Sequence, residues 1–543
     1  MSEENTNKLG IVVSGSLTKG VEVRLDSSAS IEEMVVGRYV AIDGEQRRFF
    51  GMITDISLGV TDQRLTFSPP DVSDPFVAEV LSGTSTYGIL HVTPYLTISE
   101  GVADLLEGPQ PVKTVPGHFS LVKMASEQDM ELVFGKEDKE RFYHIGNPLD
   151  METKLCINLE EFVKRSNGIF GKSGTGKTFF TRMLLIGMLQ KSKAVNLIFD
   201  MHNEYGWAGT REGGPPVKAL KQLFPAAVAV FTLDEESSRR RKVSTDFVVK
   251  IGYDEITPED ISILRSTLNI TELAVEAAYQ LRKILGKDWL QKVLELDDES
   301  IGEIVKDANI HESTLQSLKR GLGIIGRMGF IVKDAHDDTV KSILDYLARG
   351  TNVVLEFGRY REISTYLLVA NMLSRRIYNR YQQQTEEAMA AGNDALKPKP
   401  LVITIEEAHK FLNPEVASKT IFGTIAREMR KYNVSLLVID QRPSGIDEEV
   451  MSQMGTKITY LLDNEKDVDS VLAGVSGKSE LKSVIARLSP NRRQAIIFGH
   501  SVLMPVAFEA REFGSAESYK EFGSTDEAEI QEQAEKDKED LWG

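Results

Sequence analysis

Residues 171–178 read GKSGTGKT, and this stretch decides the fold of the chain. It fits G-x-x-x-x-G-K-[ST], the P-loop that binds the phosphates of nucleotides. The apolar residues 168–170 before it predict a strand, and residues 179–190 after it read as an amphipathic helix. Glycines let the backbone curl around an anion, and the helix N-terminus adds partial positive charge. An ordinary glycine-rich turn is disfavoured by this strand and helix, so we predict a nucleoside triphosphate site.

The P-loop pattern assigns roles to individual residues. Lys177 is expected to reach the β- and γ-phosphates, and the Thr178 hydroxyl is expected to bind Mg²⁺. ATP and Mg²⁺ are therefore the predicted cofactors. The residues expected to contact the nucleotide are Gly171, Ser173, Gly174, Thr175, Gly176, Lys177, Thr178 and Phe179.

The composition is that of an ordinary globular protein, with 543 residues, 41% hydrophobic and 27% charged. A single cysteine, Cys156, excludes an intramolecular disulfide framework and a cysteine-rich metal site. There is no apolar run near 20 residues and no basic, apolar leader at the N-terminus. We therefore expect a cytoplasmic protein with no membrane span.

The net charge of −17 bears on possible partners. Such acidity argues against a protein that coats DNA with its whole surface. It leaves room for a ring that gathers basic residues on one inner face, because local potential decides binding.

Patterning divides the chain into several parts. Residues 1–150 contain short apolar runs broken by Gly, Ser and Asp, which predicts a small β-barrel or sandwich. Residues 151–254 and 351–513 alternate strands with helices, which predicts an α/β core with a parallel sheet. Residues 255–350 show helical periodicity and are read as an insertion into that core. Residues 514–543 are rich in Glu, Asp, Ser and Gln and are expected to form a mobile acidic tail that is partly helical at most.

The core strands are expected where Val, Ile and Leu are dense. The candidates are 194–199, 228–232, 352–357, 401–405, 435–439, 457–462 and 494–498.

Residues 401–409, LVITIEEAH, place two adjacent carboxylates at the end of a buried strand. In a parallel sheet the carboxyl ends of strands open onto the ligand crevice. We assign Glu406 to the Mg²⁺ and Glu407 to the general base that activates water. The alternative is a polar strand end before a helix.

A second strand, within NLIFDMHNEY at 196–205, also delivers an acid at its end. Either Asp200 or Glu204 is a candidate to support the Mg²⁺ shell, with Asp200 preferred. The alternative is that both are loop acids in solvent.

Several polar residues elsewhere are candidates to act on the γ-phosphate. Arg427 and Arg430 are three apart and share a helix face, and either suits an arginine finger from a neighbouring subunit. Gln441 follows a strand and is expected to sense the γ-phosphate or the attacking water. Arg165 precedes the P-loop strand and is a further candidate to face a neighbouring site. Each arginine is equally well read as an ordinary surface residue.

Residues 239–242, RRRK, form a basic run in a predicted loop. Two interpretations stay open, contact with DNA phosphates or a solvated loop, and the second is the commoner for such runs.

Taken together, four segments resemble the HerA family of hexameric DNA translocases, which is related to FtsK. They are GKSGTGKT, FDMHNEY, ITIEEAHKFL and AREMRKYNVSLLVIDQRPSGI. VGRYV at 36–40 and FGMI at 50–53 are similar to the HAS-barrel of that family. The chain departs from many relatives at Met429, where they have Gly, and at Lys172-Ser173, where a small or apolar pair is more usual.

The resemblance implies a RecA-like P-loop ATPase core behind a HAS-barrel, and an ATP-driven helicase or translocase. It implies a homohexameric ring around double-stranded DNA, with ATP hydrolysed between subunits. It also implies a partner at the barrel end, the nuclease NurA in archaeal DNA end processing or another effector in bacterial anti-phage defence.

The same resemblance carries catalytic positions over to Lys177, Thr178, Glu406, Glu407 and Gln441. It leaves open which of Arg165, Arg427 and Arg430 acts within a subunit and which between subunits.

Two other functions remain alternatives to a motor. In one, the ring binds ATP mainly to assemble and serves as a scaffold that recruits and activates an effector, with hydrolysis secondary. In the other, the chain is a conjugative or secretion ATPase, which the lack of an apolar membrane span disfavours.

Overall fold

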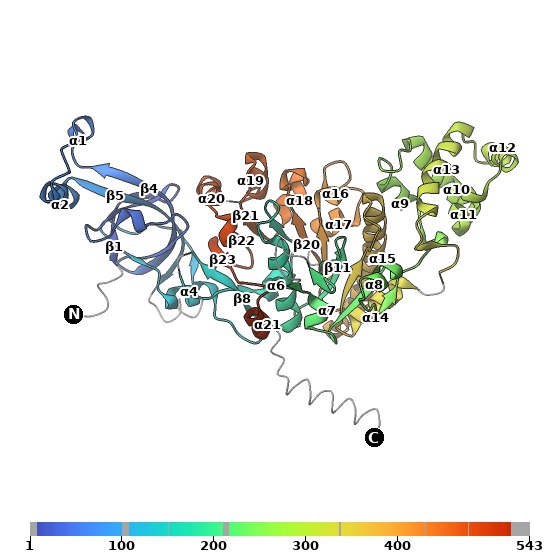
Figure 1. The fold of residues 1–543 in the computed structure, drawn as a ribbon, viewed down its shortest axis with the longest axis horizontal. Coiled ribbons are helices and arrows are strands. Elements are labelled where there is room, and N and C mark those ends of the chain that lie inside the picture. Colours follow the sequence, from blue (N-terminus) through green and yellow to red (C-terminus); the bar gives the residue numbers. More distant parts are fainter. Residues whose placement is uncertain are drawn as a thin grey trace, which may run out of the picture.

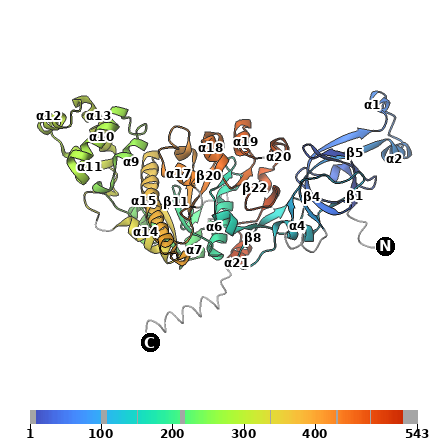
Figure 2. The same cartoon turned by 180° about the vertical axis from the view of Figure 1, so that it is seen from behind.

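A computed structural model describes residues 8–99, 108–149, 151–209, 217–335, 338–428, 431–475 and 477–522. The molecule is elongated, with a β-barrel at one end, a large sheet with its helices in the middle and a group of helices at the other end (Figures 1 and 2).

The N-terminal strands close into a six-stranded barrel, as predicted for this part of the chain. The strands follow the order β2-β1-β7-β3-β4-β5, and β5 pairs back onto β2. Alternate residues such as Val23, Val40 and Leu90 are fully buried inside it. The barrel strands, with β6 added at the edge of β5, are β1 (Lys8–Ser16), β2 (Gly20–Leu25), β3 (Tyr39–Asp43), β4 (Arg47–Val60), β5 (Thr86–Ser99), β6 (Gln110–Pro111) and β7 (Leu121–Met124).

Two of these strands extend well beyond the barrel. β4 and β5 are each 14 residues long and pair as far as Val60 and Thr86. Their far ends carry α1 (Arg64–Phe67) and α2 (Pro75–Thr84), which form the tip of a projecting arm (Figure 1). Leu58, Phe67 and Phe76 on this arm are largely exposed.

The central sheet has twelve strands in the order β15-β14-β18-β11-β19-β20-β10-β21-β22-β23-β8-β9. Neighbours from β15 through β21 are parallel, and those from β21 to β9 are antiparallel. The parallel strands are β10 (Asn167–Phe170), β11 (Val195–Asp200), β14 (Val228–Thr232), β15 (Phe247–Val248), β18 (Asn352–Glu356), β19 (Leu401–Glu406), β20 (Val434–Asp440) and β21 (Thr456–Tyr460). The rest are β8 (Phe142–Pro148), β9 (Leu155–Asn158), β22 (Gln494–Gly499) and β23 (Val506–Ala510).

Every strand predicted for the core is present within one or two residues. The antiparallel edge was not foreseen, because β8 pairs with β23 more than 350 residues away and such pairing leaves no local pattern. β8 begins at residue 142, so the core sheet starts before the expected domain boundary at 150.

Helices connect these strands and pack around the sheet. The longest, α15, runs over 28 residues and carries charged groups along much of its length. No helix of the described chain is long and apolar enough to cross a membrane. The helices of the core and its junction with the barrel are α4 (Glu127–Phe134), α5 (Leu159–Val163), α6 (Lys177–Gln190), α7 (Leu220–Leu223), α8 (Glu235–Arg240), α14 (Thr339–Ala348), α15 (Ile363–Ala390), α16 (His409–Leu412), α17 (Ile421–Arg427), α18 (Glu448–Gln453), α19 (Glu465–Val471), α20 (Lys478–Ile485) and α21 (Ala516–Phe522).

The expected helical insertion forms a body at the far end of the molecule (Figure 1). Its base is a short parallel pair, β16 (Ile251–Gly252) with β17 (Ile331–Val332). α14 follows this pair and packs on β18 and α15, so the projecting body ends before residue 350. Its helices are α9 (Pro258–Ile263), α10 (Glu272–Leu285), α11 (Trp289–Glu295), α12 (Asp298–Asp307) and α13 (Glu312–Gly326).

Part of the expected acidic tail belongs to the core. α21 docks through Phe522, which is buried and packs against Phe513, and Gln190 donates a hydrogen bond of 2.8 Å to the Phe522 carbonyl. The prediction of a tail from residue 514 was therefore wrong for α21, because its aromatic side chains find an apolar surface that composition does not reveal. Residues 523–543 lie outside the described part of the chain.

The interior of the barrel forms an apolar cluster of its own, while Tyr39, Phe50 and Met52 on another face of the barrel join the apolar cluster of the core. Tyr39 of β3 donates to the Pro505 carbonyl and accepts from the Ala507 amide, both at 2.9 Å. Ser483 of α20 donates to the Thr54 carbonyl at 2.9 Å. These contacts fix the barrel on the antiparallel side of the sheet.

Candidate nucleotide-binding site

The P-loop lies between β10 and α6, where the sequence placed it. Gly174 and Gly176 have φ of +77° and +98°, a region that favours glycine, and a Cβ on Gly171 would lie 2.6 Å from Cβ of Tyr460. Thr175 is buried, and its hydroxyl donates to the Lys172 carbonyl at 2.9 Å. The loop is thus held in a tight curl at the N-terminus of α6, which is the arrangement that binds phosphate.

Lys177 is almost fully buried at the start of α6. Its Nζ donates to the carbonyls of Gly171 and Lys172 at 2.6 and 2.7 Å. Burial lowers the pKa of this ammonium to about 8, although the carboxylates of Asp440, Glu407 and Glu406 act in the opposite direction. The cation therefore stands beside three acids at the floor of the site.

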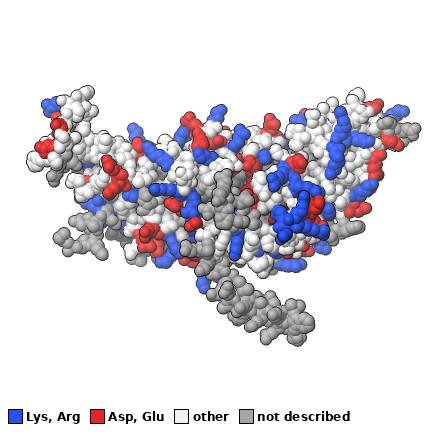
Figure 3. All heavy atoms as spheres, in the orientation of Figure 1, with Lys and Arg blue, Asp and Glu red and all other residues white. Residues whose placement is uncertain are grey.

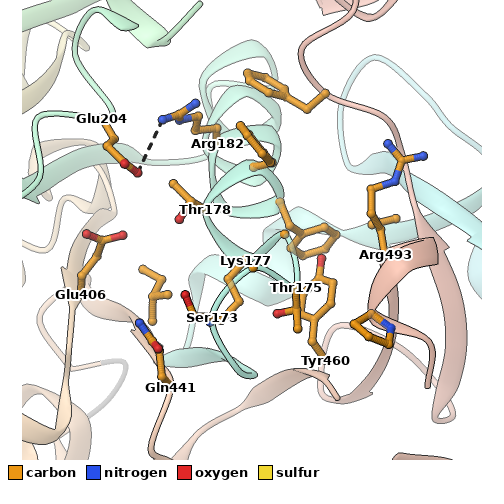
Figure 4. Close-up of a pocket in the computed structure, with 18 of the residues that line it drawn as sticks. Ser173, Thr175, Lys177, Thr178, Arg182, Glu204, Glu406, Gln441, Tyr460 and Arg493 are labelled. Atoms are coloured by element: carbon orange, nitrogen blue, oxygen red, sulfur yellow. Dashed lines mark ion pairs between the residues drawn. The ribbon is translucent and has the colours of Figure 1, made fainter. Parts of the chain in front are cut away.

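A cavity of about 960 Å³ opens in front of the P-loop. Ser173, Thr178, Glu406 and Gln441 face it from the P-loop and from the ends of β19 and β20 (Figure 4). Segments 490–493 and 509–513 close its other side. The structure thus brings together most of the predicted nucleotide and catalytic residues, although they are spread over 270 positions of the chain.

Glu406 is the last residue of β19 and is 8% exposed. Tyr205 donates a hydrogen bond of 2.9 Å to its Oε1, while Oε2 has no hydrogen-bond partner among the described residues. Burial, followed by the charge of Asp200, raises the pKa of this carboxyl to about 8. A buried carboxylate oxygen without a donor suits a cation, so Glu406 and Thr178 fit a Mg²⁺ ion.

Glu407 adopts φ of +52°, which is uncommon for a residue with a side chain. This turn aims its carboxylate into the cavity, whereas Glu406 stays in line with the strand. Gln441 donates to Glu407 Oε1 at 3.3 Å, and Glu407 Oε2 lies 3.7 Å from Nδ1 of His409. Since unusual backbone conformations concentrate at functional sites, the geometry favours Glu407 as the base.

Asp440 and His409 were missed by sequence reasoning as members of the site. The fully buried Asp440 accepts from the backbone N–H of His409 at 2.6 Å and lies 3.0 Å from its Nδ1. The hydrogen bond to Asp440 raises the pKa of His409. Within the described chain, Glu407, His409 and Asp440 also have the spacing of a metal site. The oxygens of Asp440 already accept from His409 and from the Arg442 N–H at 2.7 Å, so this group reads as a hydrogen-bonded network.

Asp200 does not face the cavity, contrary to the preferred assignment to the metal shell. It is fully buried, and its carboxylate accepts the backbone N–H groups of Glu204, Tyr205 and Gly206 at 2.8, 2.7 and 3.3 Å. Asp200 therefore shapes the loop after β11. Glu204, the alternative, lines the cavity instead.

Arg182 was also missed. It lies on α6 four residues after Thr178, is 99% buried and reaches within 3.9 Å of Glu204 (Figure 4). Its guanidinium sits over the rings of Phe179 and Tyr205, at 5.4 and 5.8 Å from their centroids. The one sequence pattern that could have indicated Arg182 is its spacing of four residues from Thr178, which places both on one face of a helix.

Phe179 connects the P-loop helix to the C-terminal segment. Its ring stacks on Phe513, with centroids 6.2 Å apart and an interplanar angle of 27°. Both rings line the cavity and give it an aromatic wall.

Two of the predicted arginine fingers, Arg165 and Arg427, do not line this cavity. Arg165 precedes β10, at the opposite end of the strand from the P-loop, and packs against Gly455. Arg427 lies at the end of α17, 3.5 Å from the Ala417 carbonyl and 3.9 Å from Glu449. Arg430 lies outside the described residues. Arg493 and Arg511 line the cavity from the antiparallel side.

The family models and the most similar curated proteins all point to the HerA helicases. The family model for the central domain of helicase HerA matches residues 143–377, and that for the HAS barrel domain matches residues 9–104. The DNA double-strand break repair helicase HerA of Sulfurisphaera tokodaii is 24% identical over 93% of both chains. That of Sulfolobus acidocaldarius is 25% identical over 72% of this chain and 73% of its own.

Solved structures are more distant. VirB4 of Thermoanaerobacter pseudethanolicus is 13% identical, with a TM-score of 0.43 over 69% of this chain and 98% of its own. The bacterial conjugative coupling protein TrwB is 12% identical, with a TM-score of 0.45 over 72% and 93%. The family matches confirm the predicted fold class, the resemblance to the HerA family and the prediction of an ATPase of the helicase type.

Proposed function

Because the chain joins a HAS barrel to a HerA-type helicase core, we propose that this protein is an ATP-driven DNA translocase. The observation that carries the proposal is the convergence of Lys177, Thr178, Glu406, Glu407 and Gln441 on one cavity. The relatives from Sulfurisphaera tokodaii and Sulfolobus acidocaldarius are described as DNA double-strand break repair helicases, which supports DNA as the track.

The residues of the cavity divide the work of hydrolysis. The P-loop backbone and Lys177 hold the phosphates of ATP, and Thr178 and Glu406 hold Mg²⁺. The ion, when bound, neutralises charge that develops on the phosphate oxygens. Glu407 takes a proton from the attacking water. At the same time the water oxygen bonds to the γ-phosphorus, and the bond from the γ-phosphorus to the ADP oxygen breaks. Gln441 orients Glu407 through the 3.3 Å hydrogen bond.

The further parts of the proposal rest on resemblance. They are a homohexameric ring around double-stranded DNA, a nuclease or other effector at the barrel end, and a role in DNA end processing or anti-phage defence. In such a ring, Arg165, Arg427 and Arg430 are proposed to meet the site of a neighbouring subunit, since a closed ring brings different surfaces together.

The proposal is tested by the Mg²⁺-dependent ATPase rate with and without linear double-stranded DNA at fixed low salt. We expect DNA to raise the rate, and Lys177→Ala to reduce it about a hundredfold or more in both conditions. Lys172→Ala is the matched control, because its ammonium points away to Asp463 at 3.2 Å. ATP hydrolysis that never responds to DNA would contradict a DNA motor.

A scaffold remains the second candidate, and the β4–β5 arm favours it. Phe67, Leu58 and Phe76 are 86%, 82% and 71% exposed on this arm, which is unusual for large apolar side chains unless a partner covers them. A Glu407→Gln protein that keeps full biological activity would favour the scaffold, whereas loss of activity would favour the motor.

A further inference from the structure

The basic run at 239–242 lies at the end of α8, directly after β14. Arg239, Arg240 and Lys242 are exposed, while Arg241 is half-buried. A dense group of Lys and Arg covers the surface where α8 lies (Figure 3, in the orientation of Figure 1). Such a cluster stands out on a chain with a net charge of −17.

Part of this positive charge is uncompensated. Arg240, Lys242 and Arg361 have no acidic partner within the part of the chain that the structure describes. Arg239 pairs with Glu235 at 2.6 Å but keeps 76% of its side chain exposed. An exposed cluster of this kind presents several cations to one polyanion.

Ion pairs between the basic segment and neighbouring parts of the core hold the cluster in a fixed shape. Arg241 pairs with the fully buried Glu356 at the end of β18. Arg359, just beyond the same strand, pairs with Glu236 at 2.9 Å and with Asp234 at 3.5 Å. These ion pairs join α8 to the segment that carries Arg361. The exposed cations of both segments therefore lie on a surface whose shape is held by ion pairs.

The position of the cluster relates it to the nucleotide site. β14, β18, β11 and β19 are consecutive in the sheet and parallel, so their carboxyl ends share one edge. β14 leads to the cluster and β19 ends at Glu406. The loop after β11 therefore lies between the two.

This loop touches both sides. Tyr205 donates to Glu406 at 2.9 Å, and two residues later Trp207 donates through Nε1 to the Ser244 carbonyl at 2.9 Å. Between them, Gly206 lies so close to Glu356 that a Cβ would be 2.4 Å from Oε1 of that carboxylate. Loop 200–207 is thus a packed connection from the acid of the nucleotide site to the basic segment.

We propose that Arg239, Arg240 and Lys242, with Arg361, contact the phosphodiester backbone of a polynucleotide, and that loop 200–207 couples this contact to the nucleotide site. The inference rests on the proposed function and adds the surface that grips the track. Guanidinium groups suit phosphate because they donate in pairs, and exposed cations give affinity without sequence preference. Coupling through a contiguous packed element requires no contact between nucleotide and DNA.

Binding of a fluorescent DNA duplex, and of a single strand of equal length, to the full-length protein tests the contact. We expect Arg240→Ala/Lys242→Ala to weaken binding about tenfold at low salt and to reduce the slope of log affinity against log salt by about 2 per chain engaged. Arg240→Glu/Lys242→Glu should weaken it further. Lys283→Ala/Lys287→Ala, which removes two exposed charges from the insertion, should leave affinity and slope unchanged.

The outcomes separate this inference from the proposed function. Wild-type affinity and slope in both double variants, with a wild-type protein that binds DNA, would overturn the inference and leave the proposed function standing. A wild-type protein that binds neither DNA would overturn both. A loss confined to the duplex or to the single strand supports the contact and identifies which of them is the track.

Trp207→Phe tests the connection separately, because it removes the donor to Ser244 and keeps an aromatic ring. We expect DNA affinity to stay near wild type while the stimulation of ATP hydrolysis by DNA falls several-fold. Unchanged stimulation would overturn the coupling role of loop 200–207.

Discussion

Two regions on the same edge of the core sheet differ in how far their charged side chains are exposed to solvent. At the ends of β19 and β20, Glu406 and Asp440 are buried and Glu407 is half-buried, and hydrogen bonds such as that from the His409 N–H to Asp440 hold them in place. At the end of β14, the charged groups are exposed and only their base is fixed, through Arg241 and Glu356. The difference teaches that the first region depends on the position of single atoms, whereas the second depends on summed charge.

Glu407→Gln should show the largest single-residue effect in the region at the ends of β19 and β20. We expect turnover to fall about a hundredfold to a thousandfold with ATP still bound, because an amide cannot take a proton from water. Steady-state ATPase and nucleotide-binding measurements check this. Glu415→Gln, at an exposed position near α16, should behave as wild type, and a fall of less than tenfold for Glu407→Gln would exclude it as the base.

Arg241→Ala and Arg240→Ala compare two adjacent arginines, of which Arg241 is half-buried and paired with Glu356 while Arg240 is exposed. Removing Arg241 leaves Glu356 buried without its ion-pair partner, so we expect a loss of about 2 kcal/mol in the free energy of unfolding. Arg240→Ala should cost less than about 0.5 kcal/mol. Chemical denaturation measures both values, and equal losses would mean that the exposed segment is as tightly held as the buried one.

Tyr205→Phe removes the only hydrogen bond that Glu406 accepts through its side chain among the described residues. The expected loss in stability is about 1 kcal/mol, since one hydrogen bond to a buried group is lost. We also expect the ATPase activity of Tyr205→Phe to need a higher Mg²⁺ concentration than that of the wild type, because Glu406 is held less firmly. A Mg²⁺ titration that matches wild type would argue that Tyr205 only packs.

The smallest expected change is in the pH dependence of stability, compared between Glu406→Gln and the wild type in metal-free protein. The folded pKa of Glu406, about 8, lies above its ordinary value of 4.5, so the folded state binds more protons between these two pH values. Stability from this group is therefore present below pH 4.5 and is lost as pH rises toward 8. Thermal unfolding in a chelator from pH 5 to 9 should show a shallower decline for Glu406→Gln, and identical declines would contradict the raised pKa.

Local patterns were enough to find much of this molecule. The P-loop was found because its glycines and Lys177 act through the backbone conformation of one short segment. The core strands were found because a strand buried on both faces is apolar at every position. Glu406 and Glu407 were found because parallel strands deliver their carboxyl ends to one edge.

The errors share one physical origin. Asp200 has the residue type and strand position of a metal ligand, yet three backbone N–H groups of the following loop occupy its carboxylate. The aromatic wall from Phe513 and the docking of α21 depend on contacts with segments hundreds of residues away.

The sequence by itself determined the class of the protein, the position of the nucleotide loop and the acids at the strand ends, because each depends on neighbouring residues. The tertiary structure alone decided which acid faces the cavity, which cations have no acidic partner among the described residues, and how loop 200–207 joins the two regions. These depend on which distant groups satisfy each buried donor and acceptor, and that pairing is set only when the strands are placed side by side.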